Sequence, residues 1–409
     1  MKTVIVVGGG ASGLMAAYAA AKNGHSVTLL EKNEKLGKKI YITGKGRCNL
    51  TNDCLPDEFL QNVVRGEKFL RGAIYKFPPS RMMELLEENG LPLKTERGSR
   101  VFPVSDHASD VTKTLEKMCK EAGVVFKFNE EVQKIGVLHS TMSDITTQKA
   151  VYSCDAAVIA TGGLSYPSTG STGDGMTWAK DLGHTIVPCV PSLVGLNCKG
   201  DFSAVQGISV KNAVLTARRN GKVIFSELGE LLFTHYGISG PLVLTLSALV
   251  NRLPMNEVTL TLDFKPALDE GQLDSRILRD FSERKNEQMK NVLRGLLPGG
   301  LGVYVLKEAG ISLEKQANAV TKEERAKLLQ ALKNLPIRAV SLRGFEEAVV
   351  TSGGVSLSEV NPKTMESKLI KGLYFCGEVL DLDAFTGGFN LQIAFATGYA
   401  AGSAINNVK

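Results

Sequence analysis

The sequence has no apolar run long enough to cross a membrane. Its longest apolar block, residues 241–250, is shorter than the about 18 residues that a span requires, and it is interrupted by Thr245 and Ser247. The apolar residues 4–7 run directly into Gly8, without the longer hydrophobic region and the cleavage site of a secretory signal. We therefore expect a cytoplasmic protein that makes no contact with a membrane.

Cysteine and histidine are too irregularly placed to indicate a disulfide framework or a metal site. The seven cysteines contain no CxxC motif, which is typical of a reduced, cytosolic protein with a large core. Four of the histidines have no spacing that is typical of metal ligands: His25, His107, His139 and His184. We therefore expect no metal.

The charge balance gives little reason to expect a nucleic-acid partner. The chain has 48 Lys and Arg against 42 Asp and Glu, a net charge of +6 over 409 residues. Much of the excess lies in residues 263–345, with 15 basic and 11 acidic residues, and we interpret it as a solvated face. We expect a small-molecule substrate, and the sequence assigns no oligomeric state.

With 409 residues, the chain is long enough for about 2.7 average domains, and its 43% hydrophobic content can fill several cores. A strand at 2–7, a helix at Ala11–Lys22 and a strand at 26–30 form a βαβ unit at the N-terminus. The polar residues 33–60 predict an extended loop. Further along, the patterns predict an antiparallel β unit at 202–264, a helical insert at 267–335 and a closing helix at 391–405.

The strongest motif is Gly8-x-Gly10-x-x-Gly13. It follows a predicted strand and opens a predicted helix, and Glu31 stands 18 residues after Gly13 at the end of the next strand. In this context the motif is the dinucleotide-binding fingerprint. Gly10 lets the pyrophosphate approach the backbone, the helix N-terminus offers free N–H groups to it, and Glu31 accepts hydrogen bonds from the ribose.

Two further glycine-bearing turns favour FAD over NAD. Thr161-Gly162 follows one predicted strand, and Gly377-Glu378 follows another, shortly before Gly388 opens the last helix. A carboxylate can accept a hydrogen bond from a ribitol hydroxyl, and a helix N-terminus stabilises negative charge on a flavin. Taken alone, each of these sequences also fits an ordinary β-turn that binds no ligand. Together with the first motif they predict one extended ligand, FAD.

Several longer strings resemble the BaiN-type family of bacterial flavoproteins, which includes the aminoacetone-oxidase-like enzymes and is described as NAD(P)/FAD-dependent oxidoreductases. Besides the first glycine motif, they are TGKGRCNLTN at 43–52, GSRVFPVSD at 98–106, LFTHYGISGP at 232–241, TSGGV at 351–355 and GEVLDLDAFTGGFNLQ at 377–392. Their order matches the family over essentially the whole chain. Lys45 stands where the family commonly has glycine.

The resemblance implies an α/β fold with three domains. These are a split Rossmann-like FAD-binding domain at 1–190 and 346–409, a β-rich domain at 191–264 and 336–345, and a helical insert domain at 265–335. We assign to the cofactor Gly8, Gly10, Ala11, Ser12, Gly13, Glu31, Lys32, Lys39, Gly46, Arg47, Cys48, Asn49, Val132, Thr161, Gly162, Gly377, Glu378, Gly388, Asn390 and Leu391.

The catalytic candidates are His235, as a general acid or base, and Arg47, as a partner for an anion. The resemblance implies that the His235 loop faces the flavin, while a histidine without a proton role at a domain interface remains the alternative. We expect hydride transfer between the flavin and either a small organic substrate or NAD(P)H. Because only one fingerprint is present, NAD(P)H would bind transiently.

Two other functions remain open. An FAD protein that modifies or binds RNA shares the N-terminal fingerprint, although the basic residues are not interleaved with aromatic ones. A flavin disulfide reductase would use Cys48 and Cys54, but five residues separate them instead of four, and the chain lacks a second glycine fingerprint for NADPH.

Overall fold

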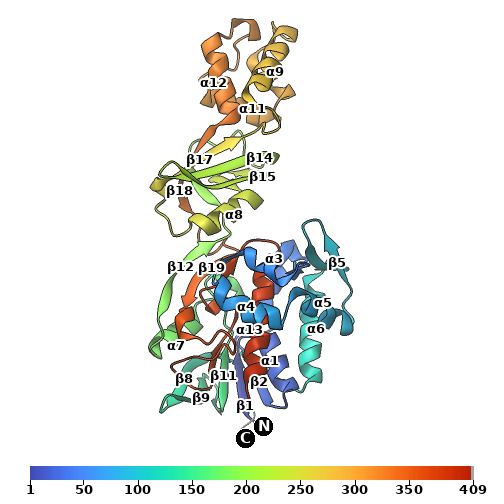
Figure 1. Ribbon diagram of the computed structural model, residues 1–409, viewed down its shortest axis with the longest axis vertical. Helices are drawn as coiled ribbons and strands as arrows, with labels where there is room; N and C mark the ends of the chain where they lie inside the picture. Colours follow the sequence, from blue (N-terminus) through green and yellow to red (C-terminus); the bar gives the residue numbers. More distant parts are fainter. Residues whose placement is uncertain (407–409) are drawn as a thin grey trace. The chain divides into compact units, whose positions relative to one another are not determined.

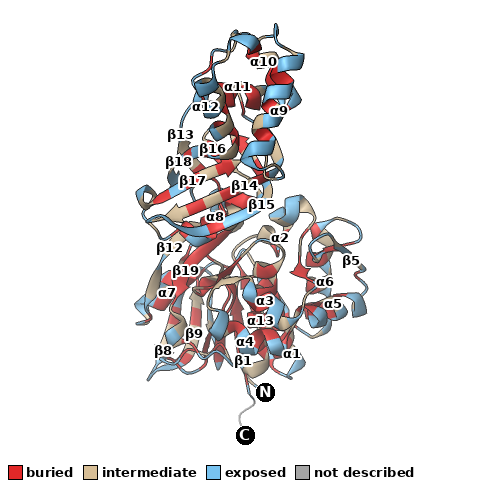
Figure 2. Ribbon diagram, turned by 45° about the horizontal axis from the view of Figure 1, so that its top comes forward, coloured by how far each residue is buried: buried red, intermediate tan, exposed pale blue. Residues whose placement is uncertain are grey.

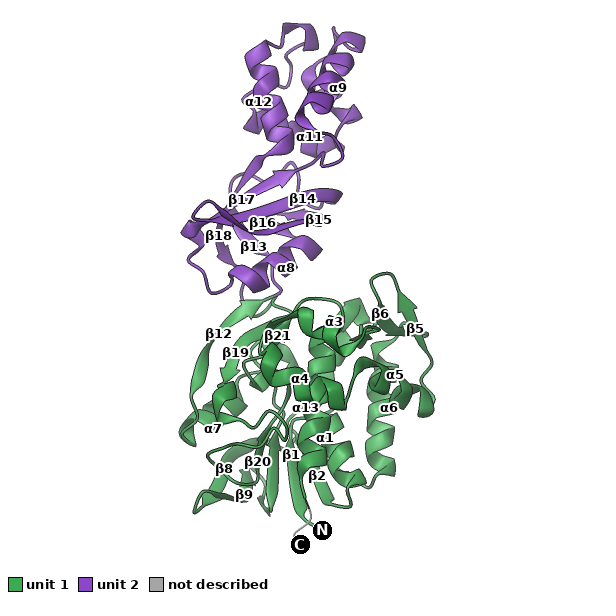
Figure 3. Ribbon diagram, in the orientation of Figure 1, with its two compact units in different colours: residues 1–192, 345–409 green, residues 193–344 purple. Residues whose placement is uncertain are grey.

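The computed structural model describes residues 1–406 and divides the chain into two compact units (Figure 3). Unit 1 consists of Met1–Ser192 and Phe345–Lys409, and unit 2 of Leu193–Gly344. The chain therefore leaves unit 1 after Ser192 and returns at Phe345. The finer division into three domains stays a prediction.

A parallel sheet forms the centre of unit 1, with the strand order β20-β11-β1-β2-β7 (Figure 1). Its strands are β1 (Thr3–Val7), β2 (Ser26–Glu31), β7 (Val125–Phe128), β11 (Ala156–Ile159) and β20 (Leu373–Phe375). β1 is buried from Val4 to Val7 and β11 throughout its length, and Figure 2 colours the interior of unit 1 mainly as buried. Continuous apolar runs are typical of parallel strands in this position.

Helix α1 (Ala11–Lys22) connects β1 to β2, as the βαβ pattern predicts, and the last helix, α13 (Phe389–Ala404), packs along it. The other helices of unit 1 are α2 (Lys38–Ile42), α3 (Pro56–Gln61), α4 (Glu67–Lys76), α5 (Pro79–Glu88), α6 (Ala108–Glu121) and α7 (Asp174–Asp181).

Smaller sheets surround the parallel one. Their strands are β3 (Thr51–Asn52), β4 (Val63–Arg65), β5 (Leu93–Glu96), β6 (Arg100–Pro103), β8 (Val132–Leu138), β9 (Thr141–Thr147), β10 (Val151–Ser153), β12 (Ile186–Ser192), β19 (Val350–Val355) and β21 (Asp383–Ala384). The expectation of one extended loop at 33–60 is wrong, because α2, β3 and α3 lie within it. For α3 the sequence carried a start signal, Pro56 followed by two acidic residues.

Unit 2 contains a closed six-stranded barrel with the strand order β13-β16-β15-β14-β17-β18. The strands are β13 (Leu196–Lys199), β14 (Ser209–Arg219), β15 (Lys222–Thr234), β16 (Gly237–Ser239), β17 (Val258–Asp263) and β18 (Leu335–Leu342), and α8 (Pro241–Val250) follows β16. All pairings are antiparallel, as the alternating pattern predicts.

Four helices are inserted between β17 and β18: α9 (Glu270–Glu283), α10 (Met289–Val292), α11 (Gly299–Glu308) and α12 (Lys322–Lys333). They share one hydrophobic core with the barrel. Tyr304 of α11 has its ring centroid 5.8 Å from that of Phe202 and 6.0 Å from that of Phe233, a barrel residue. Within residues 1–406, no helix has the length and apolar character to pass through a lipid bilayer.

Candidate functional site

Four strand ends bring the predicted cofactor residues of unit 1 to one edge of the parallel sheet. Val7 of β1 is opposite both Leu30 of β2 and Ile159 of β11, and Ile159 is opposite Phe375 of β20. Because these strands run in the same direction and end in register, the residues that follow them meet at the carboxyl edge. Ligands of open α/β sheets bind at this edge.

Each of the three glycines of the fingerprint is needed for a different physical reason. A methyl group on Gly13 would lie 1.8 Å from the carbonyl oxygen of Gly8, so glycine is what allows α1 to approach the turn. Gly8 has a φ of 104°, and a methyl group on it would lie 2.6 Å from the carbonyl oxygen of Ala160. Gly10 differs, because a methyl group there would meet no atom within 4 Å. The space in front of Gly10 is where a pyrophosphate fits.

Helices α1 and α13 run parallel and are joined by close glycine contacts. A methyl group on Gly398 would lie 2.3 Å from the carbonyl oxygen of Ser12, and one on Gly402 would lie 2.2 Å from that of Ala16. Ser12 is near the start of α1, whereas Gly398 is well inside α13. With a rise of 1.5 Å per residue, the N-terminus of α13 therefore lies about 12 Å beyond that of α1.

Both helix N-termini lack a side-chain cap. Gly10 and Gly388 occupy the N-cap positions, and neither can donate or accept through a side chain. The free N–H groups of the first turn and the positive end of each helix dipole favour negative charge at two points. The offset between these points matches a ligand with two anionic groups joined by a short chain. FAD has this form, with its pyrophosphate, ribitol and flavin, and the residues present fit it.

The residues around the start of α13 are held by specific contacts. In the orientation that satisfies both ends of its amide, Asn49 accepts a hydrogen bond from the Gly388 N–H and donates one to the Thr51 carbonyl, each at 3.1 Å. The Asn390 side chain binds the backbone of Ala384, accepting at 3.0 Å and donating at 2.8 Å. Asn390 and Leu391 therefore offer a ligand their backbone N–H groups, while the Asn390 side chain fixes the loop.

Residues at the end of β2 form the far side of the site. Glu31 is buried and accepts hydrogen bonds from the N–H of Gly9 at 2.7 Å and from that of Asn33 at 2.8 Å. Lys32 is paired with Asp174 at 2.7 Å. Val132 begins β8, and the loop before it contacts β2 through a backbone hydrogen bond from residue 130 to Glu31. Glu31 and Val132 therefore lie near each other at this edge.

The turn after β11 contains a buried hydroxyl without a partner. Thr161 Oγ1 has no hydrogen-bond partner within residues 1–406, and a methyl group on Gly175 would lie 2.2 Å from it. Gly162 follows in a left-handed conformation with a φ of 78°. An unpaired buried hydroxyl costs free energy unless a ligand satisfies it, which agrees with the assignment of Thr161 to the cofactor.

Arg47 is engaged by two carboxylates. Its guanidinium pairs with Glu96, donates to Asp106 at 2.7 Å and lies over the ring of Phe102, 4.2 Å from the centroid. These acidic partners raise the pKa of Arg47 above its ordinary value. The geometry assigns Arg47 the task of fixing the β5–β6 hairpin beside the loop at 46–49. Its catalytic role stays a prediction.

Cys48 is fully buried, directly after Arg47, and has a φ of 60°. Burial raises the pKa of the Cys48 thiol to about 12. Cys54 is partly exposed, and burial followed by the nearby charges of Glu58 and Asp53 raises the pKa of its thiol to about 11. The thiolate is the reactive form, so neither cysteine is activated for disulfide exchange.

We expect Cys54→Ser to retain both its bound flavin and its turnover rate. The serine hydroxyl replaces a thiol that the environment keeps protonated at neutral pH. The ratio of flavin to protein absorbance and the turnover rate should stay within about twofold of the wild-type values. Loss of activity with a disulfide as electron acceptor in this variant would support the disulfide reductase instead.

His235 belongs to unit 2. It lies on the two-residue turn between β15 and β16, where Thr234 is paired with Gly237. The imidazole is exposed and meets the ring of Tyr236 edge-on, with centroids 5.0 Å apart. The guanidinium of Arg343 lies over the other ring, 4.2 Å from the centroid of Tyr236. The turn therefore carries an exposed imidazole beside the ring of Tyr236, which Arg343 also contacts.

Two residues that the sequence did not assign join the site in unit 1. Ser165 and Thr351 surround the carboxylate of Glu378, which also pairs with Lys39 at 2.6 Å. The string TSGGV, which includes Thr351, was the one signal that could have indicated this position. Ser165 lies in a loop with no motif of its own.

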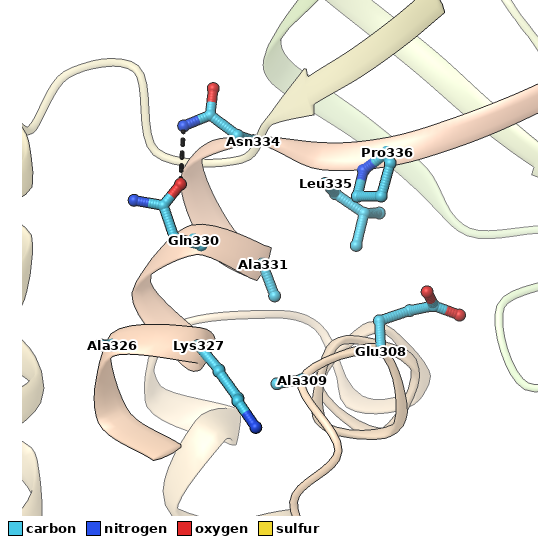
Figure 4. A pocket seen from close by; sticks show the side chains of 9 residues that line it. All are labelled: Glu308, Ala309, Ala326, Lys327, Gln330, Ala331, Asn334, Leu335 and Pro336. Carbon is cyan, nitrogen blue, oxygen red and sulfur yellow. Dashed lines mark hydrogen bonds between the residues drawn. The ribbon is translucent and has the colours of Figure 1, made fainter. Parts of the chain in front are cut away.

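Unit 2 also has an open groove between α11, α12 and the start of β18 (Figure 4). Gln330 of α12 and Asn334 are hydrogen-bonded to each other at 3.3 Å, Lys327 projects from the same helix, and Glu308 projects from α11. No residue that the sequence assigns to the site lines this groove. Within residues 1–406, no three His, Cys, Asp or Glu side chains are grouped to hold a metal ion.

The HI0933-like protein Rossmann domain model matches residues 2–404. The chain belongs to the HI0933-like family. This confirms the resemblance to the BaiN-type flavoproteins and the Rossmann-type α/β fold, and it identifies the chain as an FAD-dependent oxidoreductase. FAD is the cofactor of this family, and it supplies the redox chemistry.

Curated relatives extend over the full chain. The 3-dehydro-bile acid delta(4,6)-reductase of Clostridium scindens is 33% identical over 411 residues, covering 99% of each chain. The ribosomal RNA dihydrouridine synthase of Haemophilus influenzae is 29% identical over 409 residues, covering 98% of each. Among solved structures, a 3-ketosteroid-delta4-(5alpha)-dehydrogenase from Rhodococcus jostii RHA1 has a TM-score of 0.56 at 16% identity. That match covers 98% of this chain and 96% of the other, and it supports the fold alone.

Proposed function

We propose that this HI0933-like oxidoreductase reduces a carbon–carbon double bond conjugated with a carbonyl, using hydride that NAD(P)H delivers to FAD. The full-length likeness to a bile acid reductase is the observation that carries the proposal. The relative from Haemophilus influenzae is named for making dihydrouridine, which is uridine with one ring double bond saturated. Both names describe the addition of two hydrogen atoms to such a bond.

Bound FAD would supply hydride transfer between the donor and the substrate. The N–H groups at the start of α1 would bind its pyrophosphate, and those at the start of α13 would favour negative charge on its ring system. The substrate then needs one proton in addition to the hydride. His235, the general acid that the sequence predicts, would supply this proton, because an imidazole side chain is able to donate one.

An anaerobic spectrum of the holoenzyme tests the proposal. NADH or NADPH should bleach the flavin band near about 450 nm, and a conjugated enone such as 4-androstene-3,17-dione should restore it without oxygen. Bleaching by neither nucleotide would contradict the assigned hydride donor. Recovery with oxygen but with no conjugated carbonyl compound would indicate an oxidase.

We expect His235→Asn to lower the rate of substrate reduction by about 10²- to 10⁴-fold while leaving flavin reduction by NAD(P)H unchanged, because only substrate reduction consumes the proton. Rapid-mixing measurements of the two half-reactions separate these rates. The matched control is His139→Asn, an exposed histidine in unit 1 with a φ of 48°, a conformation that asparagine tolerates. Equal slowing of both half-reactions would contradict the acid role.

A second candidate function is the reduction of a uracil base in ribosomal RNA. The relative named for that activity matches 98% of the chain, and residues 263–345 carry the mild basic excess. Incubating the holoenzyme with NADPH and unmodified ribosomal RNA, followed by mass spectrometry of the nucleosides, tests this function. Dihydrouridine formation would establish RNA as the substrate. If no dihydrouridine forms and a small enone is turned over, the reduction of a small molecule is supported as the function.

A further inference from the structure

A charged cluster at the carboxyl edge of the sheet joins four segments of unit 1. The Lys39 ammonium donates to Ser165 Oγ at 2.5 Å and to Glu378 Oε2 at 2.6 Å. Glu378 Oε1 accepts from Ser165 Oγ at 2.6 Å and from the Thr351 N–H at 2.7 Å. The Thr351 hydroxyl in turn accepts from the N–H groups of residues 164 and 165. Every charged group in the cluster therefore has a partner.

The Lys39 side chain crosses the edge of the sheet at the glycine loop. The backbone just before α2 is bound to that loop, because the Gly37 N–H donates to the Gly9 carbonyl at 2.9 Å. The Lys39 ammonium, in contrast, lies among residues that follow β11 and β20, on the other side of β1 in the sheet. The residue before Glu378 contacts the start of α1, because a methyl group on Gly377 would lie 2.5 Å from Ser12 Oγ. The pair of Lys39 and Glu378 therefore lies near the glycine loop.

Most of the hydrogen-bonding capacity of Glu378 is already used. A carboxylate accepts about four hydrogen bonds, and three of these positions are filled by protein donors. Burial raises the pKa of Glu378, but Lys39, Ser165 and the Thr351 N–H together outweigh it, so the net pKa is lower than usual. The group is an anion whose environment is built around Lys39.

We propose that Lys39 provides the positive charge for the FAD pyrophosphate and that Glu378 is a positioning residue for Lys39 instead of a direct ligand of the ribitol. Ser165 and Thr351 complete this support by fixing the carboxylate. Without Glu378, the flexible lysine side chain would be free to extend into solvent, and its charge would be lost from the site. The inference rests on FAD as the cofactor and is independent of the substrate proposed above.

A double-mutant cycle on FAD affinity tests this assignment. The dissociation constant is measured by flavin fluorescence on FAD-free protein for Lys39→Met, for Glu378→Gln and for the double variant. Each single change should weaken FAD binding by roughly 10- to 100-fold, because a charge-assisted contact is lost. The double variant should bind FAD as weakly as Lys39→Met alone, since Glu378 acts through Lys39.

Additive losses in the cycle would overturn the proposal, because they would show that Glu378 contacts FAD by itself. Unchanged affinity in Lys39→Met would overturn it as well. Lys39→Arg should recover most of the FAD affinity that Lys39→Met loses. If Lys39 had a purely structural role, restoring the positive charge would not restore the affinity. The matched control is Lys38→Met, the neighbouring lysine, which pairs with Glu34 at 2.9 Å and should leave the affinity within about twofold.

Thermal unfolding of the FAD-free variants separates folding from binding. Lys39→Met leaves the partly buried carboxylate of Glu378 without its cation, which destabilises the protein, and the double variant removes that charge again. The double variant therefore keeps the test valid if the single one unfolds. All measurements use FAD alone, so a failure of the reductase proposal would leave their outcome unchanged.

Discussion

Gly10→Val is expected to give a folded protein that purifies without flavin. Gly10 has an extended backbone, with a φ of −82° and a ψ of −171°, which valine adopts without strain. The added side chain meets no atom within 4 Å of its first carbon, so it fills the space in front of α1 and excludes the pyrophosphate. The visible absorbance near about 450 nm should fall to near zero while the far-ultraviolet circular dichroism stays unchanged.

The control for this variant is Gly299→Val in unit 2, at the first residue of α11, where an added side chain also meets open space. It should keep its full flavin content. Gly13→Ala provides a contrast, since its methyl group would collide with the Gly8 carbonyl, and we expect it to fail in folding. A fully yellow Gly10→Val protein would show that the pyrophosphate does not lie at this loop.

Gly398→Ala is expected to weaken FAD binding, although residue 398 lies far from the N-terminus of α13. The new methyl group would lie 2.3 Å from the Ser12 carbonyl oxygen, which forces α13 away from α1. Overpacking of this kind costs about 1–3 kcal/mol. Because α13 would move as one body, the free N–H groups of its first turn would shift away from the cofactor. We expect a lower melting temperature and FAD affinity reduced by roughly 10-fold.

The matched control for this change is Gly299→Ala, again a helical glycine but with open space around it. It should be neutral or slightly stabilising, since alanine has the higher helix propensity. Differential scanning calorimetry and FAD titration of the two variants compare them directly. A Gly398→Ala protein with the melting temperature and FAD affinity of the wild type would contradict the close parallel contact of α1 and α13.

The parts of the fold that could be predicted have local signals. The βαβ unit is carried by a buried strand, a glycine fingerprint and a small-residue helix that are consecutive in the chain. The alternating residues at 202–264 predict antiparallel strands, although not their closure into a barrel. The closing helix predicted at 391–405 lies close to the observed Phe389–Ala404. In contrast, α2 has no side-chain cap at its start and covers only Lys38–Ile42, so its polar sequence indicated a loop.

The roles of the charged residues could not be predicted, because their partners are distant in the sequence. Arginine is a residue type that binds anions, yet two carboxylates, those of Glu96 and Asp106, oppose the single positive charge of Arg47, whereas only one opposes that of Lys39. Lys39 and Glu378 were each assigned to the cofactor, but nothing in either neighbourhood indicates that they pair. A charge on its own says what a side chain can attract, and only the folded chain decides which partner reaches it first.

The sequence alone determined the family, the FAD chemistry and the two glycine-led helix starts, because each depends on residues that are neighbours along the chain. The tertiary structure decided how those starts are spaced. The contacts of Gly398 and Gly402 with α1 set an offset of about 12 Å between the two N-termini. It also decided where the lysine charge lies. Lys39 follows β2 and Glu378 follows β20, and these residues, 339 positions apart, meet only because both strands end at the same edge of one parallel sheet.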